Sequence, residues 1–260
     1  MRSVALTLGL LATTIGAEPA LPAVQPVAPA AVAPLAAVPE AAPKVAGPVP
    51  FVASYRMVRD GTHIADARFE LARDGEDGWT FSSETSAAGL IAIFYRDVIA
   101  EHSAFRMGSE RPIPLAYRYE HRGSSKDRDA RYGFDWQRER LTGVYRGKPV
   151  DLPLARGLLD PLTLRLAVGY DLARGTLQPS YSVIERRKLQ EYRLAALPPQ
   201  RIRIAAGEFE VRGVVRSSAD GTKTTRFLYA PALDWAPVLL EQSETDEATY
   251  RLELVSFTRR

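Results

Sequence analysis

The stretch D-A-R-Y-G-F-D-W at residues 129–136 alternates apolar and polar side chains at every second position. A period of two places Ala130, Tyr132, Phe134 and Trp136 on one face of an extended strand, with the charged residues on the other. Such alternation is typical of an antiparallel sheet that has one face on a core and one in water. The stretch therefore predicts a half-buried β-strand.

The same alternation recurs on both sides of this stretch, at residues 51–57, 115–120 and 250–254. In the second of these, Leu115, Tyr117 and Tyr119 are predicted to face the core together. Turn signals such as Asp60-Gly61 separate the apolar runs, and short connections favour hairpins and meanders over parallel units. We expect a mainly β fold: a curved antiparallel sheet or open β-barrel, with one or two helices that cover or plug its interior.

Residues 160–175, D-P-L-T-L-R-L-A-V-G-Y-D-L-A-R-G, break the strand pattern. Asp160 suits an N-cap, Pro161 suits the first helical position, and Gly175 suits the C-terminus. Apolar residues recur at every fourth position, at Leu162, Leu166 and Tyr170. We predict a helix that lays this stripe against the sheet or plugs the open end of a barrel. A second segment, 87–95, is apolar all round and predicts a buried strand or, preferably, a short covering helix.

The N-terminal fifth of the chain has a different composition from the rest. Residues 1–17 combine a positive start, a short apolar run and small residues near Ala17, which predicts a secretory signal peptide; an uncleaved anchor is the alternative. Residues 18–50 contain nine Pro and 11 Ala and predict an extended linker, either a tether or an inert leader. We expect one β-rich domain over 51–260 and no transmembrane span in the mature chain.

Composition narrows the function classes. The chain has no Cys, which excludes disulfides, Cys-ligated metal sites, a thiol nucleophile and a lipidated Cys. A net charge of +3 is dispersed, so the densest run, residues 185–188, predicts a solvated strand face and no nucleic-acid partner. There is no Gly-rich phosphate loop, and we expect no cofactor and no metal.

Catalytic signatures are sparse. No G-x-S-x-G elbow occurs, so a serine hydrolase would need a triad assembled from distant residues around one of three histidines. His63 and Asp66 are expected to point to opposite faces of a strand, as are Glu101 and His102. His121 precedes a Gly-Ser-Ser turn and is predicted to be a solvated turn residue. We predict no catalytic residues.

Four motifs resemble those of the bacterial family of unknown function DUF3108, a group of secreted, mostly β proteins. They are F-V-A-S-Y at 51–55, L-L-D-P-L-T-L at 158–164, L-P-P at 197–199 leading into 201–211, and F-L-Y-A-P-A-L-D-W-A-P-V-L-L-E at 227–241. The resemblance covers roughly 51–258 and implies no assigned enzyme activity. It implies an architecture similar to LolA/LolB lipoprotein carriers, an open barrel around an apolar cavity. Without a lipidation Cys, the analogy is to a soluble carrier.

These observations lead to a functional hypothesis: a secreted, periplasmic, non-enzymatic binding or accessory protein that holds a lipid-like apolar ligand. An envelope assembly factor that acts through protein–protein contacts is the alternative, and a hydrolase on a β scaffold is a third class. The oligomeric state stays open. The candidate apolar lining comprises Leu90, Ile91, Ile93, Phe94, Tyr117, Tyr132, Phe134, Trp136, Leu162, Leu166 and Trp235. Asp160 and Arg226 are predicted to form an ion pair at the cavity mouth.

Overall fold

A computed structural model describes residues 47–89, 92, 97–123, 128–218, 221–244 and 247–260. The predicted signal peptide and most of the predicted linker lie outside these residues. So do Leu90, Ile91, Ile93 and Phe94, and with them most of the predicted covering helix at 87–95. Within the described residues, no helix is both long enough and apolar enough to cross a membrane.

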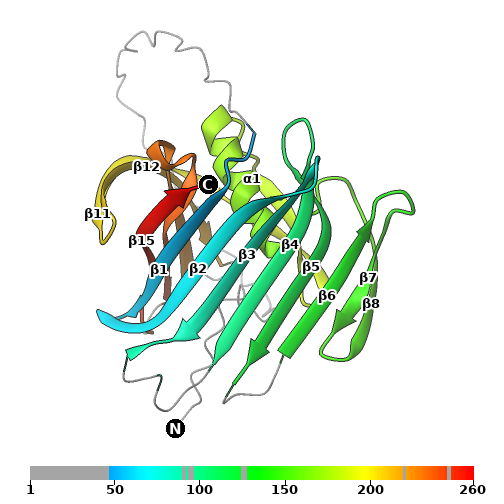
Figure 1. Ribbon diagram of the computed structural model, residues 1–260, viewed down its shortest axis with the longest axis horizontal. Coiled ribbons are helices and arrows are strands. Elements are labelled where there is room, and N and C mark those ends of the chain that lie inside the picture. Colours follow the sequence, from blue (N-terminus) through cyan, green and yellow to red (C-terminus); the bar gives the residue numbers. More distant parts are fainter. Residues whose placement is uncertain (1–46, 90–91, 93–96, 124–127, 219–220, 245–246) are drawn as a thin grey trace, which may run out of the picture.

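The fold is dominated by one thirteen-stranded antiparallel sheet (Figure 1). Its strands are, in spatial order, β11 (Ala195–Ile204), β12 (Gly207–Ser217), β13 (Lys223–Ala230), β14 (Ala236–Glu244), β15 (Tyr250–Arg259), β1 (Phe51–Arg59), β2 (Thr62–Asp74), β3 (Gly78–Ala87), β4 (Val98–Met107), β5 (Pro112–Arg122), β6 (Arg128–Asp135), β7 (Arg140–Tyr145) and β8 (Lys148–Pro153). Every neighbour in this order is also a neighbour in sequence, except that β15 pairs with β1. The expected meander of hairpins is thus confirmed, and the two ends of the domain are joined in mid-sheet.

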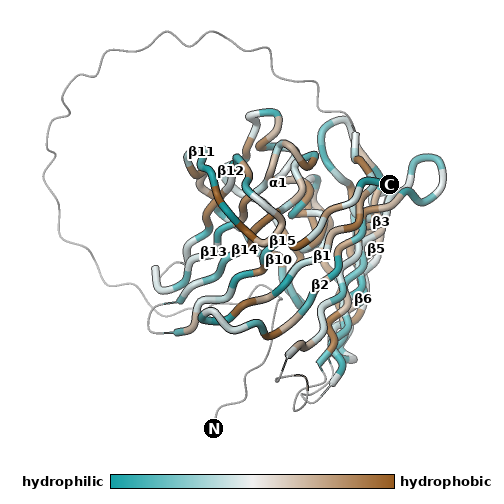
Figure 2. Tube along the Cα trace, turned by 60° about the vertical axis from the view of Figure 1, so that its left-hand side comes forward, coloured by the Kyte–Doolittle hydropathy of each residue, from teal (hydrophilic) through white to brown (hydrophobic). Residues whose placement is uncertain are grey.

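The sheet curves strongly but does not close, as Figures 1 and 2 show from two directions. The free edges are β8, the last strand before the segment that contains the helix, and β11, the first strand of this sheet after it. Both edges carry proline, at Pro149 and Pro153 on β8 and at Pro198 and Pro199 on β11. Proline lacks the N–H that a further strand would need, so these edges are protected against pairing with another chain.

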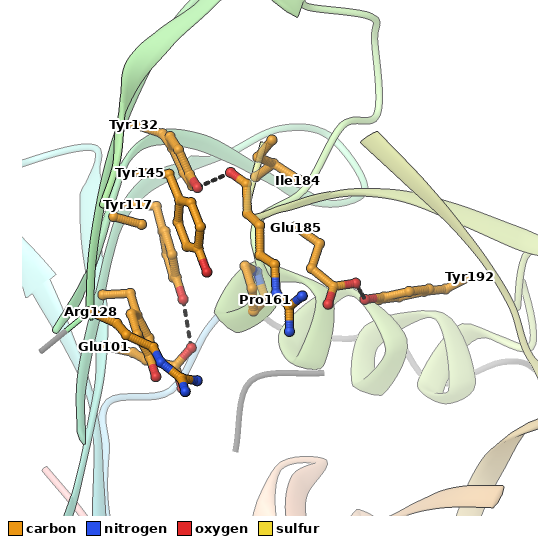
Figure 3. A pocket seen from close by; sticks show the side chains of 12 residues that line it. Glu101, Tyr117, Arg128, Tyr132, Tyr145, Pro161, Ile184, Glu185 and Tyr192 are labelled. Atoms are coloured by element: carbon orange, nitrogen blue, oxygen red, sulfur yellow. Dashed lines mark hydrogen bonds between the residues drawn. The ribbon is translucent and has the colours of Figure 1, made fainter. Parts of the chain in front are cut away.

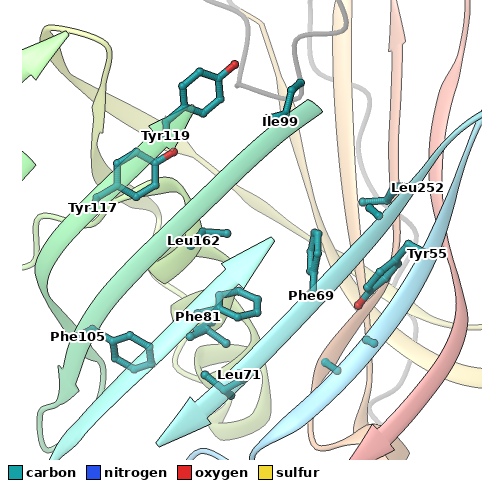
Figure 4. Packing of buried hydrophobic residues seen from close by; sticks show 14 of the residues in the cluster. Tyr55, Phe69, Leu71, Phe81, Ile99, Phe105, Tyr117, Tyr119, Leu162 and Leu252 are labelled. Atoms are coloured by element: carbon teal, nitrogen blue, oxygen red, sulfur yellow. The ribbon is translucent and has the colours of Figure 1, made fainter. Parts of the chain in front are cut away.

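Side-chain alternation places the core on the concave face. Phe51, Ala53, Tyr55 and Met57 of β1 are buried, as the pattern predicts. Figure 4 shows residues of this core from several strands, including Phe69, Phe81 and Leu252.

The prediction for Leu115 was wrong. The β4–β5 register skips this residue, pairing Ala104 with Ala116 and Phe105 with Pro114. A bulged residue shifts the alternation by one, so Leu115 is 40% exposed while Tyr117 and Tyr119 are buried. The same device exposes Val255 on β15, where the register with β1 also slips.

The predicted helix is confirmed as α1 (Pro161–Arg174). The Asp160 side chain accepts hydrogen bonds from the backbone N–H groups of Leu162 at 2.8 Å and Thr163 at 2.9 Å. Thr163 Oγ1 in turn accepts from the Asp160 N–H at 3.0 Å, which completes a capping box. Gly175 ends the helix in the left-handed region, at φ 69°, where a residue without Cβ is favoured.

The helix is buried on every side, which the apolar stripe alone did not predict. Leu162, Leu166 and Tyr170 join the core of the sheet, as expected. The opposite face, with Leu164 and Val168, packs into a second cluster against β9, β10, β12 and β13. Helix α1 therefore fills the concave side of the sheet and does not merely cover it.

A two-stranded hairpin, β9 (Ser180–Glu185) and β10 (Lys188–Arg193), completes the fold. The segment 185–188, predicted as a solvated strand face, is instead the turn of this hairpin. Arg186 and Arg187 form the tip, and Arg186 takes the left-handed region at φ 57°. The hairpin is tied to the segment before α1, where Leu159 and Val183 form a parallel bridge.

The Asp160 carboxyl gives the fold a testable pH dependence. It is fully buried, and burial raises its pKa from 3.8 to about 6 despite the hydrogen bonds from Ser103 and the helix N-terminus. The folded state therefore binds a proton more readily than the unfolded state, so this group's contribution to stability falls as pH rises from about 4 to about 6. Asp160→Asn keeps the cap and removes the charge. Between pH 4.5 and 7.5, we expect the free energy of unfolding to fall by about 2 kcal/mol more in the unmodified protein than in the variant. Urea unfolding at the two pH values measures this difference. Parallel curves for the two proteins would contradict the prediction.

Gly169 tests the packing of α1. A Cβ at this position would lie 2.9 Å from the carbonyl oxygen of Trp235 and 3.3 Å from the Tyr229 ring. Alanine favours an isolated helix by about 1 kcal/mol, yet overpacking against backbone costs about 1–3 kcal/mol. We expect Gly169→Ala to lower the free energy of unfolding, measured by urea titration. An unchanged or increased stability would show that the 234–235 loop yields freely.

Candidate functional site

A cleft opens between the sheet and the β9–β10 hairpin, at the N-terminal end of α1 (Figure 3). Its volume is about 70 Å³, which is room for a few water molecules or one ligand group. It is lined from strands β4 to β7 by Glu101, Tyr117, Tyr119, Arg128, Ala130, Tyr132 and Tyr145, and from the other side by Pro161, Ile184, Glu185, Arg186 and Tyr192. We call it the tyrosine cleft.

Strand register arranges the tyrosines of the sheet in two rows. Tyr117 on β5 lies opposite Tyr132 on β6, and their rings stack with centroids 6.0 Å apart and planes 12° from parallel. In the next row Ala130 lies between Tyr119 and Tyr145. The small side chain in that row leaves a gap between two aromatic neighbours, which opens the cleft.

Glu101 is a buried carboxylate at the wall of the cleft. It accepts hydrogen bonds from Tyr117 Oη at 2.6 Å and from Ser83 Oγ at 3.3 Å. Arg165 of α1 is its ionic partner, with Nη2 3.7 Å from Glu101 Oε2. Burial and the nearby Glu101 together raise the pKa of Tyr117 well above its usual value, so its hydroxyl stays a donor.

Arg165 is itself buried, with 4% exposure, in the middle of the protein. Its guanidinium lies 5.4 Å from the centroid of the Phe69 ring. Its Nε and Nη1 atoms have no hydrogen-bond partner among the described residues. Glu101 is therefore the carboxylate that keeps this cation in the interior, and the pair joins helix to sheet.

Glu185 faces the cleft from the end of β9. Its Oε2 accepts a hydrogen bond from Tyr192 Oη at 2.7 Å (Figure 3), while Oε1 is buried without a partner in the described part of the chain. Burial, with Glu185 nearby, raises the pKa of Tyr192, so this phenol also remains protonated. One carboxylate oxygen is thus left free to accept a further donor.

Two arginines line the open part of the cleft. Arg128 stands at the start of β6, and Figure 3 shows its side chain pointing into the cleft. Arg186 reaches it from the hairpin tip, and its carbonyl oxygen accepts a short hydrogen bond from Tyr132 Oη. Neither guanidinium has a carboxylate within ion-pair distance among the residues that the structure describes.

The structure separates the predicted lining residues into different environments. Tyr117 and Tyr132 line the tyrosine cleft. Phe134 and Trp136 stack on each other at 6.3 Å and border a separate open groove with Leu115 and Gly133. Leu162 and Leu166 are core residues of α1, and Trp235 is partly buried against the second cluster beneath Arg212.

The predicted ion pair between Asp160 and Arg226 does not form. Asp160 is committed to the helix N-terminus and accepts from Ser103 Oγ at 2.6 Å. Arg226 lies on β13 and pairs with Glu241 of β14 at 3.2 Å. The sheet register sets Arg226 directly opposite Glu241, which sequence spacing could not reveal.

Two predictions about histidine were also wrong. His63 and Asp66 contact each other at 2.8 Å, because the β1–β2 register slips at Ile64 and returns both side chains to one face. His121 is not a solvated turn residue but is 1% exposed, with Nε2 3.2 Å from Asp97 Oδ1. No group of three or more metal-ligating side chains occurs in the described ranges.

Sequence reasoning missed the polar half of the cleft. Glu101, Arg128, Glu185 and Arg186 come from three separate parts of the chain, and none belongs to a recognisable motif. Two signals were available: the tyrosines at 117, 119, 132 and 145 alternate on neighbouring strands, and the turn at 185–188 has no glycine. Together they indicate an aromatic surface beside a constrained basic turn.

Comparison with known proteins supports the fold. The sequence profile described as "Protein of unknown function (DUF3108)" matches residues 51–255. No curated protein matches the chain. A crystal structure of a β-barrel-like protein of the domain of unknown function DUF1849 from Brucella abortus is similar, with TM-score 0.56 and 11% identity, over 82% of this chain and 98% of that one. A structure described as "a putative lipoprotein from Parabacteroides distasonis ATCC 8503" has TM-score 0.33 and 7% identity, over 81% and 96%. The likeness to the first concerns the fold alone, and the kinship to lipoprotein carriers stays a prediction.

The Glu101–Arg165 pair can be tested through stability. Glu101→Gln keeps an acceptor for Tyr117 but leaves the Arg165 cation buried without its carboxylate. Breaking a buried pair from one side costs about 3–5 kcal/mol, so we expect a loss of this size in urea unfolding. The double variant Glu101→Gln/Arg165→Met removes both charges and should recover most of it. If the single variant is as stable as the unmodified protein, solvent reaches Arg165 and the pair is not buried in solution.

Proposed function

The chain belongs to the DUF3108 family of proteins of unknown function, and we propose that it is a non-enzymatic binding protein of the cell envelope whose ligand occupies the tyrosine cleft. The observation that carries the proposal is a set of unsatisfied buried atoms beside that cleft. Glu185 Oε1 and Arg128 Nε are both buried without a hydrogen-bond partner in the described residues. Buried polar groups are nearly always paired, so a missing partner beside an open space points to a bound molecule.

The size of the cleft defines what it can hold. Ligand pockets for whole small molecules measure about 300–1,000 Å³, several times the volume of this cleft. Helix α1 occupies the concave side of the sheet, where an acyl chain of a lipid-like ligand would otherwise lie. The structure therefore supports binding of a small polar ligand or a headgroup, and holding a whole acyl chain would require α1 to move.

The aromatic lining suits a binding role. Tyrosine rings offer flat apolar faces for stacking, and their hydroxyl groups orient a ligand through hydrogen bonds. Tyr119 is typical, since burial raises its pKa to about 12 and keeps the phenol neutral at any physiological pH. The non-enzymatic part of the proposal is supported by Glu101, whose carboxylate is held by Arg165 and Tyr117.

The envelope location rests on the sequence of residues 1–50. A secretory signal followed by a Pro/Ala-rich stretch is expected of a protein exported across the inner membrane. That stretch also favours a second candidate function, an assembly factor that is tethered by its linker. Deleting residues 18–50 while keeping export separates the two, because a binding protein retains its ligand and a tethered scaffold loses its role.

Filling the cleft tests the binding proposal. Ala130 is 3% exposed between Tyr119 and Tyr145, so Ala130→Leu should occupy the gap. Native mass spectrometry of the full chain from the periplasm, followed by a thermal-shift screen of envelope metabolites, should find a ligand for the unmodified protein. We expect Ala130→Leu to weaken its binding at least about tenfold, as overpacking removes the space.

A matched control uses the other face of the same strands. Ala116→Leu on β5 adds the same atoms on the outer side, next to Gly133, and should leave binding unchanged. Circular dichroism checks that both variants fold. Tyr145→Phe is a second probe of the cleft, because it removes only a hydroxyl group. A ligand that survives Ala130→Leu, or the absence of any ligand, would refute the proposal.

A further inference from the structure

The arginines of the tyrosine cleft differ from the other arginines of the same strands. On the outer face of β5 and β6, Arg118, Arg122 and Arg131 all form ion pairs with Glu120. These three outer-face arginines of β5 and β6 thus share one carboxylate. Arg128 and Arg186 line a partly enclosed cleft, and within the described residues neither has such a partner. Arg128 is half-buried, with its Nε atom buried and without a partner in the described residues, whereas Arg186 is exposed at the hairpin tip. A partly buried cation without a counterion is unfavourable unless an anion joins it.

The carboxylates of the cleft do not form ion pairs with these two arginines. Glu101 is neutralised by Arg165, and Glu185 uses one oxygen for Tyr192. The lining and the Arg165 behind it therefore set three guanidinium groups against two carboxylates. The cleft and its wall therefore carry one positive charge in excess, and Arg128 and Arg186 are the cations without an ion-pair partner in the described residues.

The guanidinium groups of Arg128 and Arg186 both influence the Tyr119 hydroxyl. Each lowers the pKa of Tyr119 electrostatically, against the larger effect of burial, so both lie near the same phenol. Both arginines and Tyr119 line the same cleft. Convergent arginines are suited to the planar or tetrahedral oxygens of carboxylate and phosphate groups.

The backbone holds Arg186 in place before any ligand binds. Its φ of 57° is uncommon for a residue with a Cβ, and such conformations persist where the surroundings enforce them. Here the enforcing contact is the hydrogen bond from Tyr132 Oη to the Arg186 carbonyl oxygen. The turn and this hydrogen bond thus place the backbone of Arg186 beside the cleft.

We propose that the tyrosine cleft binds an anionic ligand group, a phosphate or a carboxylate, through Arg128 and Arg186. The inference deepens the proposed binding function and rests on it. The free Glu185 Oε1 would accept a hydrogen bond from a hydroxyl or amine beside the anionic group. The ligand class is therefore an anion with a neighbouring donor, as in a glycerophosphate headgroup or an acidic sugar.

The experiment compares charged and neutral probes on the full chain. Isothermal titration calorimetry with glycerol 3-phosphate and with glucuronate tests the soluble sources, and glycerol and glucose are the neutral controls. Sedimentation with phosphatidylglycerol vesicles, against phosphatidylcholine vesicles, tests a lipid headgroup as the source. We expect at least one anionic probe to bind and its neutral counterpart to bind at least about tenfold more weakly, since charge-assisted hydrogen bonds contribute this much.

The hairpin tip supplies a matched pair of variants. Arg186→Asn removes the proposed contact with a residue that tolerates the left-handed region. Arg187→Asn removes the same charge from the adjacent residue, which is equally exposed but does not line the cleft. We expect Arg186→Asn and Arg128→Gln to weaken binding of the anionic probe at least about tenfold, and Arg187→Asn to change it less than twofold. A thermal melt shows that each variant is folded.

The outcomes separate this inference from the proposed function. Equal weakening by Arg186→Asn and Arg187→Asn would indicate diffuse charge attraction and overturn the anion site. Binding of neutral probes that is lost in Ala130→Leu, with no preference for anions, would also overturn it while leaving the binding function intact. If no anionic probe binds at millimolar concentration, the inference fails as well.

Discussion

The apolar concave face of the large sheet must be covered, and the burial of α1 against it is the contact on which the rest of the structure depends. A sheet of thirteen strands with an open seam exposes its whole inner face unless something fills it. Helix α1 does so with residues from Leu162 to Ala173, all of them buried. Its capping by Asp160 and Gly175 gives it a fixed start and end, and hence a fixed position along the sheet.

Burying one helix inside a curved sheet also brings polar side chains into the interior of the protein. A helix that is buried all round has no wet face for its polar residues, so Arg165 and Asp171 lie inside with Leu164 and Leu166. Asp171 is satisfied by Arg111 at 2.9 Å and Tyr181 at 2.8 Å. Arg165 relies on Glu101, which draws a carboxylate and Tyr117 into the interior. The wall of the tyrosine cleft is thus a consequence of how α1 is accommodated.

The cleft also depends on the long segment between the two edges of the sheet. Between β8 and β11 the chain forms α1 and the β9–β10 hairpin, and both return to the concave side. The hairpin tip meets the tyrosines of β5 to β7 where α1 begins. This contact leaves the tyrosine cleft at the N-terminus of α1, whereas the cavity beside Leu164 and Val168 further along the helix has a volume of only about 10 Å³.

Local sequence determined the strands, their alternation and the one helix with its caps, because each of these depends on neighbours a few residues away. It failed where registers slip: bulges at Ile64 and Leu115 moved His63, Asp66 and Leu115 to unexpected faces. It could not foresee the pairing of Arg226 with Glu241 or of Glu101 with Arg165, since those partners are distant in the chain. Only the tertiary structure decided the tyrosine cleft, because a site built from three chain segments exists only after long-range packing has fixed their relative positions.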